Sequence, residues 1–361
     1  MTTPEATLRR LNRRSLMAGA GLAGVGLAVT AGMPGVWRAH AQSAGAAYPN
    51  ELVAAARKEG SVVLHSSDEA NLLAQLARAF QTSFPGIAVQ TARVDTEAQL
   101  KVISDAAGRH GVDVLTSTDL ANMVDLRRAG RLALFVPDEA RRWPDTARDP
   151  DGFYSFTALG LMVLGYNSQQ VVPEQAPKTY ADLLNARYAG KLVMAHPGLS
   201  GGGLTATFLL ANALGWPFFE QLARQGVLQV PSAAEAVDKI SSGERSAMLY
   251  GSEQTALRAR AQGGPVNMVY PTDGTAVVPT ATAVMRDAPH PNAARLLATW
   301  MVGKEAQELI VAAGARSFHP EIREPTGRMS INGIKLLAPD PILLSAEADL
   351  VKQFYAQLFQ K

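Results

Sequence analysis

Apolar and polar positions along residues 60–115 follow the pattern of short strands separated by helices. Leu73, Leu76, Phe80 and Phe84 fall on one face of a helix, and Pro85-Gly86 ends it. A second helix is predicted over about 97–107. Short apolar runs typical of strands flank the two helices: Ser61–His65, Ile87–Gln90 and Val112–Leu115. The order strand, helix, strand, helix, strand predicts an α/β fold with parallel pairing.

The middle third of the chain repeats this pattern. Lys191–Ala195 is predicted to be a strand, His196–Leu199 a turn, and Ser200–Gly203 the start of an apolar helix that runs to about residue 214. Two extended stretches bracket this third, Leu161–Tyr166 and Ala276–Ala281. We expect them to be strands that cross between two lobes.

Two further helices are predicted in the last quarter of the chain. The first spans Pro291–Ala313, with Leu297, Trp300 and Met301 on the side that packs against the first lobe. The second is amphipathic and spans about Ala346–Gln360.

The first 41 residues have the composition of an export signal. The arginine pair lies in the segment Arg13-Arg14-Ser15-Leu16. The 22 residues Leu16–Trp37 are uncharged, and Arg38-Ala39-His40-Ala41 follows them. A charged region, an apolar region and an Ala-x-Ala motif follow one another in this order in a signal peptide. The arginine pair and the glycine-rich apolar region resemble a twin-arginine signal, so we predict cleavage after Ala41. The alternative is a membrane anchor, because an uncharged run of this length can span a bilayer.

Removal of residues 1–41 changes the charge of the chain. Basic residues fall from 34 to 29 and acidic residues from 32 to 31, so the net charge moves from +2 to −2. No basic stripe remains, and we expect no nucleic-acid partner. The absence of cysteine excludes disulfides, thiolate metal sites and a lipid-modified N-terminal cysteine. A chain of 361 residues, 47% of them hydrophobic, can form two lobes.

Small hydroxyl side chains follow the predicted strands, where α/β sheets collect their ligands. His65-Ser66-Ser67 and Thr116-Ser117-Thr118 stand at the carboxyl ends of two strands. Ser200-Gly201-Gly202 opens an apolar helix, whose amides and positive dipole end favour a carboxylate, phosphonate or phosphate. The alternative for this last segment is an ordinary helix cap and turn.

Six segments together carry a resemblance to a known family: Gly60–Ser67, Val112–Ser117, Tyr180–Leu184, Tyr188–Leu192, Tyr270–Thr275 and His290–Arg295. They resemble periplasmic solute-binding proteins of ABC importers, in the two-lobed type II group that includes ferric-iron, aminoethylphosphonate, thiamine and polyamine binders. The resemblance implies two α/β lobes, each a mixed, mostly parallel sheet flanked by helices, with a ligand cleft that closes by a hinge. It also implies an ABC permease and its ATPase as partners.

The resemblance sets an expected division of the chain. Lobe 1 would comprise residues 48–164 and 277–330, lobe 2 residues 165–276, and residues 331–361 would brace either lobe. We expect a periplasmic monomer without a stable membrane anchor that binds a small molecule and performs no chemistry.

A ferric-iron receptor of the same fold is one alternative. Iron binders of this group hold the metal with a tandem tyrosine pair, helped by a His and a Glu. The corresponding positions here fall near Ser252 and Glu253, so the pair is missing, and His65 is the remaining nitrogen donor. One His and one Glu make a poor site for a hard metal. We therefore predict no metal.

The candidate lining suits a small anion or zwitterion instead. Hydroxyls and amides would bind an oxyanion, and Asp273 would receive an ammonium group unless Asp273-Gly274 is a plain turn. Tyr250 is a ligand contact or part of the core. The predicted ligand-binding residues are His65, Ser66, Ser67, Ser117, Thr118, Ser200, Gly201, Gly202, Tyr250, Asp273 and Thr275.

An exported serine hydrolase is the other alternative. Gly198-Leu199-Ser200-Gly201-Gly202 matches Gly-x-Ser-x-Gly between a predicted strand and helix, as in a nucleophile elbow. A triad would need Asp273 or Asp287 together with His290 or His319. No His-Gly-Gly-Gly stretch precedes the serine, and His196-Pro197 adds a turn after the strand. The hydrolase is therefore the less favoured interpretation.

Overall fold

The computed structural model describes residues 48–94, 96–105, 110–325 and 328–359, so the predicted export signal lies outside the described residues. The described strands form one ten-stranded sheet in the order β2-β1-β3-β9-β4-β7-β5-β6, with β10 paired to β9 and β8 to β4. The strands are β1 (Ser61–Ser66), β2 (Ala88–Arg93), β3 (Val114–Ser117), β4 (Ser155–Asn167), β5 (Leu192–Ala195), β6 (Leu228–Val230), β7 (Ala247–Ser252), β8 (Val266–Val269), β9 (Thr275–Val284) and β10 (Leu336–Leu337).

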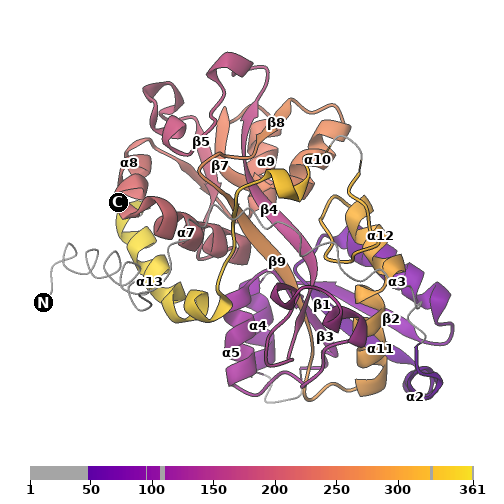
Figure 1. Cartoon of the computed structure of the whole chain (residues 1–361). Helices are drawn as coiled ribbons and strands as arrows, with labels where there is room; N and C mark the ends of the chain where they lie inside the picture. The colour runs from indigo at the N-terminus through magenta and orange to yellow at the C-terminus, as the bar shows by residue number, and fades with distance from the viewer. Residues whose placement is uncertain (1–47, 95, 106–109, 326–327, 360–361) are drawn as a thin grey trace, which may run out of the picture.

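Helices flank this sheet (Figure 1). They are α2 (Asn50–Glu59), α3 (Ala70–Ser83), α4 (Thr96–Asp105), α5 (Leu120–Arg128), α6 (Asp138–Arg141), α7 (Gly201–Leu214), α8 (Trp216–Arg224), α9 (Ala233–Ser241), α10 (Glu253–Ala261), α11 (Pro291–Val302), α12 (Lys304–Ala312) and α13 (Pro341–Phe359). None of these described helices is both long and apolar enough to cross a membrane.

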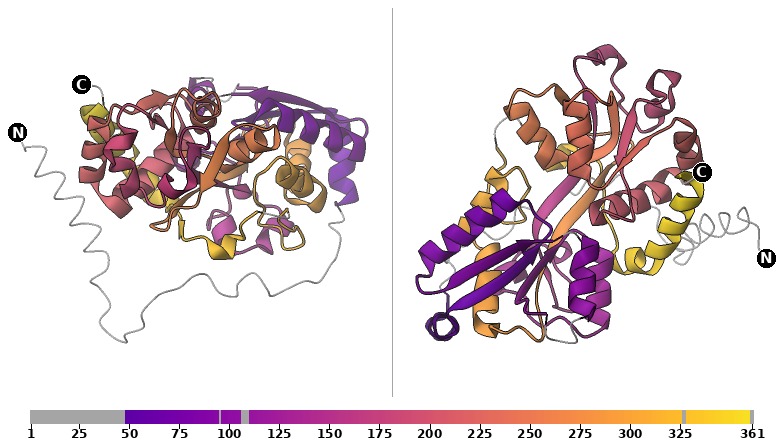
Figure 2. Two further views of the ribbon diagram at one scale, coloured as in Figure 1. Left: turned by 90° about the horizontal axis from the view of Figure 1, so that it is seen from above. Right: turned by 180° about the vertical axis from the view of Figure 1, so that it is seen from behind.

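Two parallel half-sheets are joined by a pair of antiparallel strands. β1 runs parallel to β2 and β3 in one half, which we call lobe 1, and β5 runs parallel to β6 and β7 in the other, lobe 2. β4 and β9 pair with each other from Ser155 opposite Thr282 to Met162 opposite Ala276. They continue into both lobes (Figure 2), since β9 also pairs with β3 and β4 with β7. The predicted two-lobed α/β fold is confirmed, and both predicted crossing stretches lie in these strands.

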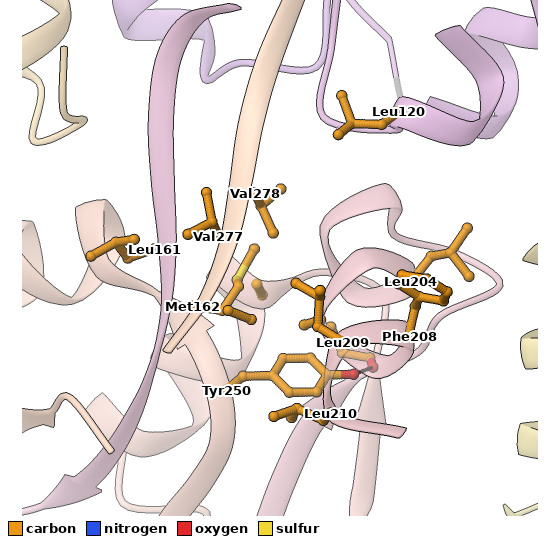
Figure 3. Packing of buried hydrophobic residues seen from close by; sticks show 14 of the residues in the cluster. Leu120, Leu161, Met162, Leu204, Phe208, Leu209, Leu210, Tyr250, Val277 and Val278 are labelled. Carbon is orange, nitrogen blue, oxygen red and sulfur yellow. Dashed lines mark hydrogen bonds between the residues drawn. The ribbon is translucent and has the colours of Figure 1, made fainter. Parts of the chain in front are cut away.

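In the described part of the chain, two apolar clusters form the core, one within lobe 1 and one that extends across both lobes, where it includes Leu120 of α5 and Leu204 of α7. In lobe 1, Leu73 and Phe80 of α3 are buried with Leu297 and Trp300 of α11 in one cluster. In lobe 2, α7 is apolar over most of its surface, so it is buried on several sides. Figure 3 shows its side chains packed against Met162, Tyr250 and Val278. Burial of each large apolar side chain contributes about 1.5–3 kcal/mol to folding.

The predicted single helix over Pro291–Ala313 is wrong, because the chain forms two helices, α11 and α12. Gly303 separates them with extended backbone (φ −75°, ψ 160°), and its carbonyl accepts the first hydrogen bond of α12 from the amide of Gln307. The Trp300 indole donates to Glu305 at 2.9 Å across the bend. The bend lets both helices pack on lobe 1.

The C-terminal helix α13 contacts both lobes. It starts earlier than predicted because the Asp340 carboxylate accepts hydrogen bonds from the amides of Ile342 and Leu343. Near its start, Ser345 donates to Asp125 of α5 in lobe 1 at 2.9 Å. Further along, Phe354 packs on Trp216 of α8 in lobe 2, with ring centroids 5.3 Å apart. The C-terminal segment therefore bridges the lobes.

Candidate functional site

A cavity of about 530 Å³ lies where the two lobes meet. The segments that follow β1, β2 and β3 line it from lobe 1, and those that follow β5, β6 and β7 line it from lobe 2. The middle of β4 and of β9 forms its floor, as Gly160 and Val278 illustrate. Five helices, α3, α4, α7, α9 and α10, begin at this cavity. Its size suits a small organic molecule.

The start of α7 reaches from lobe 2 to lobe 1. Ser200 is the N-cap, and its Oγ accepts a hydrogen bond from the amide of Gly203 at 3.0 Å. The amide of Gly201 donates to Thr96 of lobe 1 at 3.3 Å. A Cβ at Gly201 would lie 2.5 Å from the Cβ of Asp119, so this approach requires glycine. The positive end of the α7 dipole thus faces the cavity.

Two more helices of lobe 2 start at the cavity with serine caps. Ser232 accepts a hydrogen bond from the amide of Glu235 in α9, and Ser252 accepts one from the amide of Thr255 in α10. Their amides and dipoles favour an anion. Sequence reasoning missed both, although Ser232 followed by Glu235 is the spacing of a capping box.

The lobe 1 wall carries ionisable side chains: Asp68, Glu69 and Arg93. Glu69 pairs with Arg258 of α10, whose guanidinium bonds both carboxylate oxygens, so this ion pair connects the two lobes beside the cavity. Burial raises the pKa of Asp68. Sequence reasoning missed Asp68 although it follows Ser66-Ser67 directly.

The lobe 2 wall has one carboxylate, Glu253, and it is neutralised by arginines. Arg316 donates to both Glu253 oxygens, at 2.7 and 3.0 Å, and Arg328 adds further hydrogen bonds. Burial alone would raise the pKa of Glu253, but the hydrogen bonds from Arg316 and Arg328 outweigh it and hold that pKa below its ordinary value. Glu253 therefore lines the cavity with its negative charge already balanced by the two arginines.

The cavity brings together five of the predicted ligand-binding residues: Ser67, Thr118, Ser200, Gly201 and Gly202. Thr118 and Ser67 come from adjacent strand ends, and the Thr118 amide donates to the Ser67 hydroxyl at 3.2 Å. Six predicted residues lie outside the lining: His65, Ser66, Ser117, Tyr250, Asp273 and Thr275.

Strand pleating and strand direction explain these six positions. Ser66 and Ser117 are buried beneath the cavity wall, where they bond Asp68 and the amide of Asp119. His65 points to the other face of β1 from Ser66.

Tyr250 lies in the core of lobe 2, where its hydroxyl bonds Thr207 and donates to the carbonyl of Ala195. Asp273 and Thr275 stand at the start of β9, away from the cavity. Asp273 accepts a hydrogen bond from the Tyr180 amide, and Thr275 is fully buried.

The groups proposed for a hydrolase triad are dispersed. His290 bonds Asp113 at 2.8 Å and Ser61 at 3.0 Å, at the opposite end of β1 from the cavity. His319 packs edge-on against Trp143. Neither histidine, nor Asp273 or Asp287, lines the cavity. Ser200 therefore has none of the predicted triad partners beside it.

A metal site is not formed by the described residues. They contain no group of three or more His, Asp or Glu side chains that could hold a metal ion. The described lining of the cavity includes no His and no Tyr, which are the donors that the iron alternative needs.

Parts of the chain are similar in sequence to known proteins. A family model described as "Bacterial extracellular solute-binding protein" matches residues 119–327. The "Probable ABC transporter periplasmic-binding protein y4fP" of Sinorhizobium fredii is 23% identical over 248 residues, 66% of this chain and 65% of that protein. Another curated relative is matched over 56% of its length. The chain thus spans less than two thirds of these relatives.

Solved structures of other proteins share the fold. The iron-bound HitA of Pseudomonas aeruginosa has a TM-score of 0.72 at 18% identity, covering 82% of this chain and 99% of that one. AfuA of Actinobacillus pleuropneumoniae, with fructose-6-phosphate bound, has a TM-score of 0.75 at 18% identity, covering 83% and 99%. At this identity the likeness concerns the fold alone.

Proposed function

Because the chain belongs to the bacterial extracellular solute-binding proteins, we propose that it captures a small anionic or zwitterionic solute between its lobes and delivers it to an ABC permease with its ATPase. One observation carries this proposal. A cavity of about 530 Å³ lies between the lobes, and three helices of lobe 2 start at it with serine caps. Capped helix starts bind anionic groups through backbone amides without a permanent cation.

Closure around the solute is part of the proposal. β4 and β9 pass between the lobes, so residues of these strands or at their ends would act as the hinge. The proposed division is residues 48–164 with 277–330 for lobe 1 and 165–276 for lobe 2, with 331–361 as the brace; the sheet order supports it. No bond-breaking step is proposed, because none of the predicted triad partners of Ser200 belongs to the described lining of the cavity.

Export to the periplasm completes the proposal. It rests on the twin-arginine-type segment and the Ala-x-Ala end at Ala41, and on the extracellular character of the family. The exported chain would act as an unanchored monomer without a nucleic-acid partner.

A thermal-shift screen tests the proposal. The panel contains ferric iron, aminophosphonates, phosphate esters, thiamine, polyamines and small mono- and dicarboxylates. A solute that binds only the folded protein adds about 2.7 kcal/mol of stability at a hundredfold excess over Kd, so a rise in Tm of several degrees is expected for one chemical class. The absence of any shift, together with turnover of an activated ester that Ser200→Ala abolishes, would instead establish the hydrolase.

A further inference from the structure

Three carboxylates line the described cavity, and they differ in how their charge is balanced. Glu69 pairs with Arg258, and Glu253 pairs with Arg316 and Arg328. Asp68 forms no ion pair within the described part of the chain. It is therefore the lining carboxylate without a counter-charge among the described residues.

Hydrogen bonds hold the Asp68 carboxylate in place. Ser66 donates to Asp68 Oδ2 at 3.1 Å, and the Ser66 hydroxyl in turn accepts from the Asp68 amide at 2.9 Å and from the Thr116 hydroxyl at 2.5 Å. The other oxygen, Oδ1, accepts no hydrogen bond from the described residues. Thus one oxygen is oriented by the strand ends, and the other is available to a molecule in the cavity.

Capping of α3 does not explain this carboxylate. Asp68 directly precedes Glu69, the N-cap of α3, yet no side-chain cap bond is made to α3. Burial and the neighbouring Glu69 charge raise the pKa of Asp68, while the hydroxyls of Ser66 and Thr116 lower it, and no arginine or lysine is among the groups that shift it. An anion left in this environment is destabilised unless a cation joins it.

We propose that Asp68 determines specificity by pairing with a protonated amine or amidine of the solute, while the helix starts of lobe 2 hold an anionic group at its other end. This inference rests on the proposed function of solute capture. The preferred class is then a zwitterion whose charges are separated across the cavity, with the cationic end on lobe 1. The positive ends of α7, α9 and α10 lie on the opposite wall, whereas the starts of α3 and α4 and the Arg93 side chain share the lobe 1 wall with Asp68 and Glu69.

Matched pairs of probes test the inference on the wild-type protein. Each pair shares its anionic group and differs by a terminal amine: 3-aminopropylphosphonate against propylphosphonate, and γ-aminobutyrate against butyrate, each in a series of two to five carbons. Calorimetry should give about tenfold or tighter binding for the aminated member of the best pair, as expected for a charge-assisted hydrogen bond. Equal binding of the two members, or tighter binding of the amine-free anion, would overturn the inference.

Variants then assign the effect to Asp68. Asp68→Asn has the same shape without the charge, so the ratio between paired probes should fall to near one. Asp138→Asn is the control: it removes an exposed carboxylate of lobe 1 that lies outside the cavity lining, and it should leave the ratio unchanged. Ser66→Ala should reduce the ratio partially. An unchanged ratio in Asp68→Asn would contradict the role of this residue.

Failure of the inference differs from failure of the proposed function. If phosphate esters or dicarboxylates bind and no aminated probe does, solute capture stands and the Asp68 inference is wrong. If no member of either panel binds to the folded wild-type protein, the proposed function itself is contradicted.

Discussion

The two walls of the cavity bind charge by different means. Lobe 1 presents ionisable side chains directly, Asp68, Glu69 and Arg93, at or just after the ends of parallel strands. Lobe 2 presents serine hydroxyls and the amides of helix starts, and its one lining carboxylate is tied to two arginines. Fixed dipoles are already oriented in the folded protein, whereas a formal charge in a cavity needs a partner. The difference predicts which end of a solute each lobe recognises.

The largest expected effect is a loss of stability when the negative charge of Glu253 is removed from the lobe 2 wall. Glu253→Gln leaves two buried arginines short of a counter-charge, since their side chains are only 1% and 3% exposed. Loss of one partner from a buried pair costs about 3–5 kcal/mol, which urea unfolding would measure. Glu324→Gln is the control, because Glu324 bonds the same arginines but is 30% exposed. A loss of about 1 kcal/mol or less is expected there.

Acidification gives a second test of the ion pairs that Glu253 forms. Because the arginines hold the pKa of Glu253 below its ordinary value of 4.5, its contribution to stability is present above that pH and is lost as pH falls through the lower, folded-state pKa. The wild-type protein should therefore lose more stability on acidification below about pH 4.5 than Glu253→Gln does. Parallel losses in the two proteins would contradict the assignment.

The close approach of the two walls at the start of α7 requires a glycine. Gly201→Ala places a Cβ 2.5 Å from the Cβ and 2.8 Å from the backbone nitrogen of Asp119, so the lobes cannot approach as closely. We expect affinity for the solute to fall about tenfold or more, which is about 1.4 kcal/mol, as measured by calorimetry. Gly202→Ala is the control, because its Cβ meets the flexible end of Met162. Equal affinities of Gly201→Ala and the wild-type protein would show that closure does not need this contact.

Two substitutions at Ser200 distinguish the effect of the α7 dipole on solute binding from the effect of the N-cap on stability. Ser200→Ala removes the hydrogen bond to Gly203 and should lower the free energy of unfolding by about 1 kcal/mol. Ser200→Asp keeps a good cap but adds a negative charge at the start of α7, so stability should be retained while affinity for an anionic solute falls. If Ser200→Asp binds the solute as tightly as the wild-type protein, the anionic end does not lie there.

The smallest effect is expected for the ion pair between the walls. Glu69 and Arg258 are partly exposed, so Arg258→Gln should weaken binding by about 0.2–1 kcal/mol, and less at high salt. Calorimetry at two salt concentrations measures this. The charge-swapped double variant Glu69→Arg, Arg258→Glu should restore part of the loss. No recovery in the double variant would argue against a direct pairing.

Much of the fold could be predicted from the sequence, because apolar runs and helical periods are local signals. The crossing strands were recognisable from their length and apolar character. The site was predictable only in part. Ser67 and Ser66 are neighbours, yet the pleat sends one to the cavity and the other beneath it. Asp273 was misplaced because the sequence does not show which end of β9 faces the cleft.

Ion pairs between segments that are distant in the sequence could not be predicted, because no local pattern indicates them. Glu69 and Arg258 are 189 residues apart, and Glu253 meets Arg316 and Arg328 only after the chain has folded. Gly303 divides a helix that the apolar pattern continues through, because the pattern records burial rather than backbone direction.

If the lobes open and close as proposed, the C-terminal helix affects the rate of opening. α13 contributes no residue to the described cavity, yet it contacts α5 on one lobe and α7 and α8 on the other. Any rotation that parts the lobes must slide or release this helix, so the barrier to opening includes the barrier to repacking it. The residence time of the solute would then depend on a surface that the solute never touches.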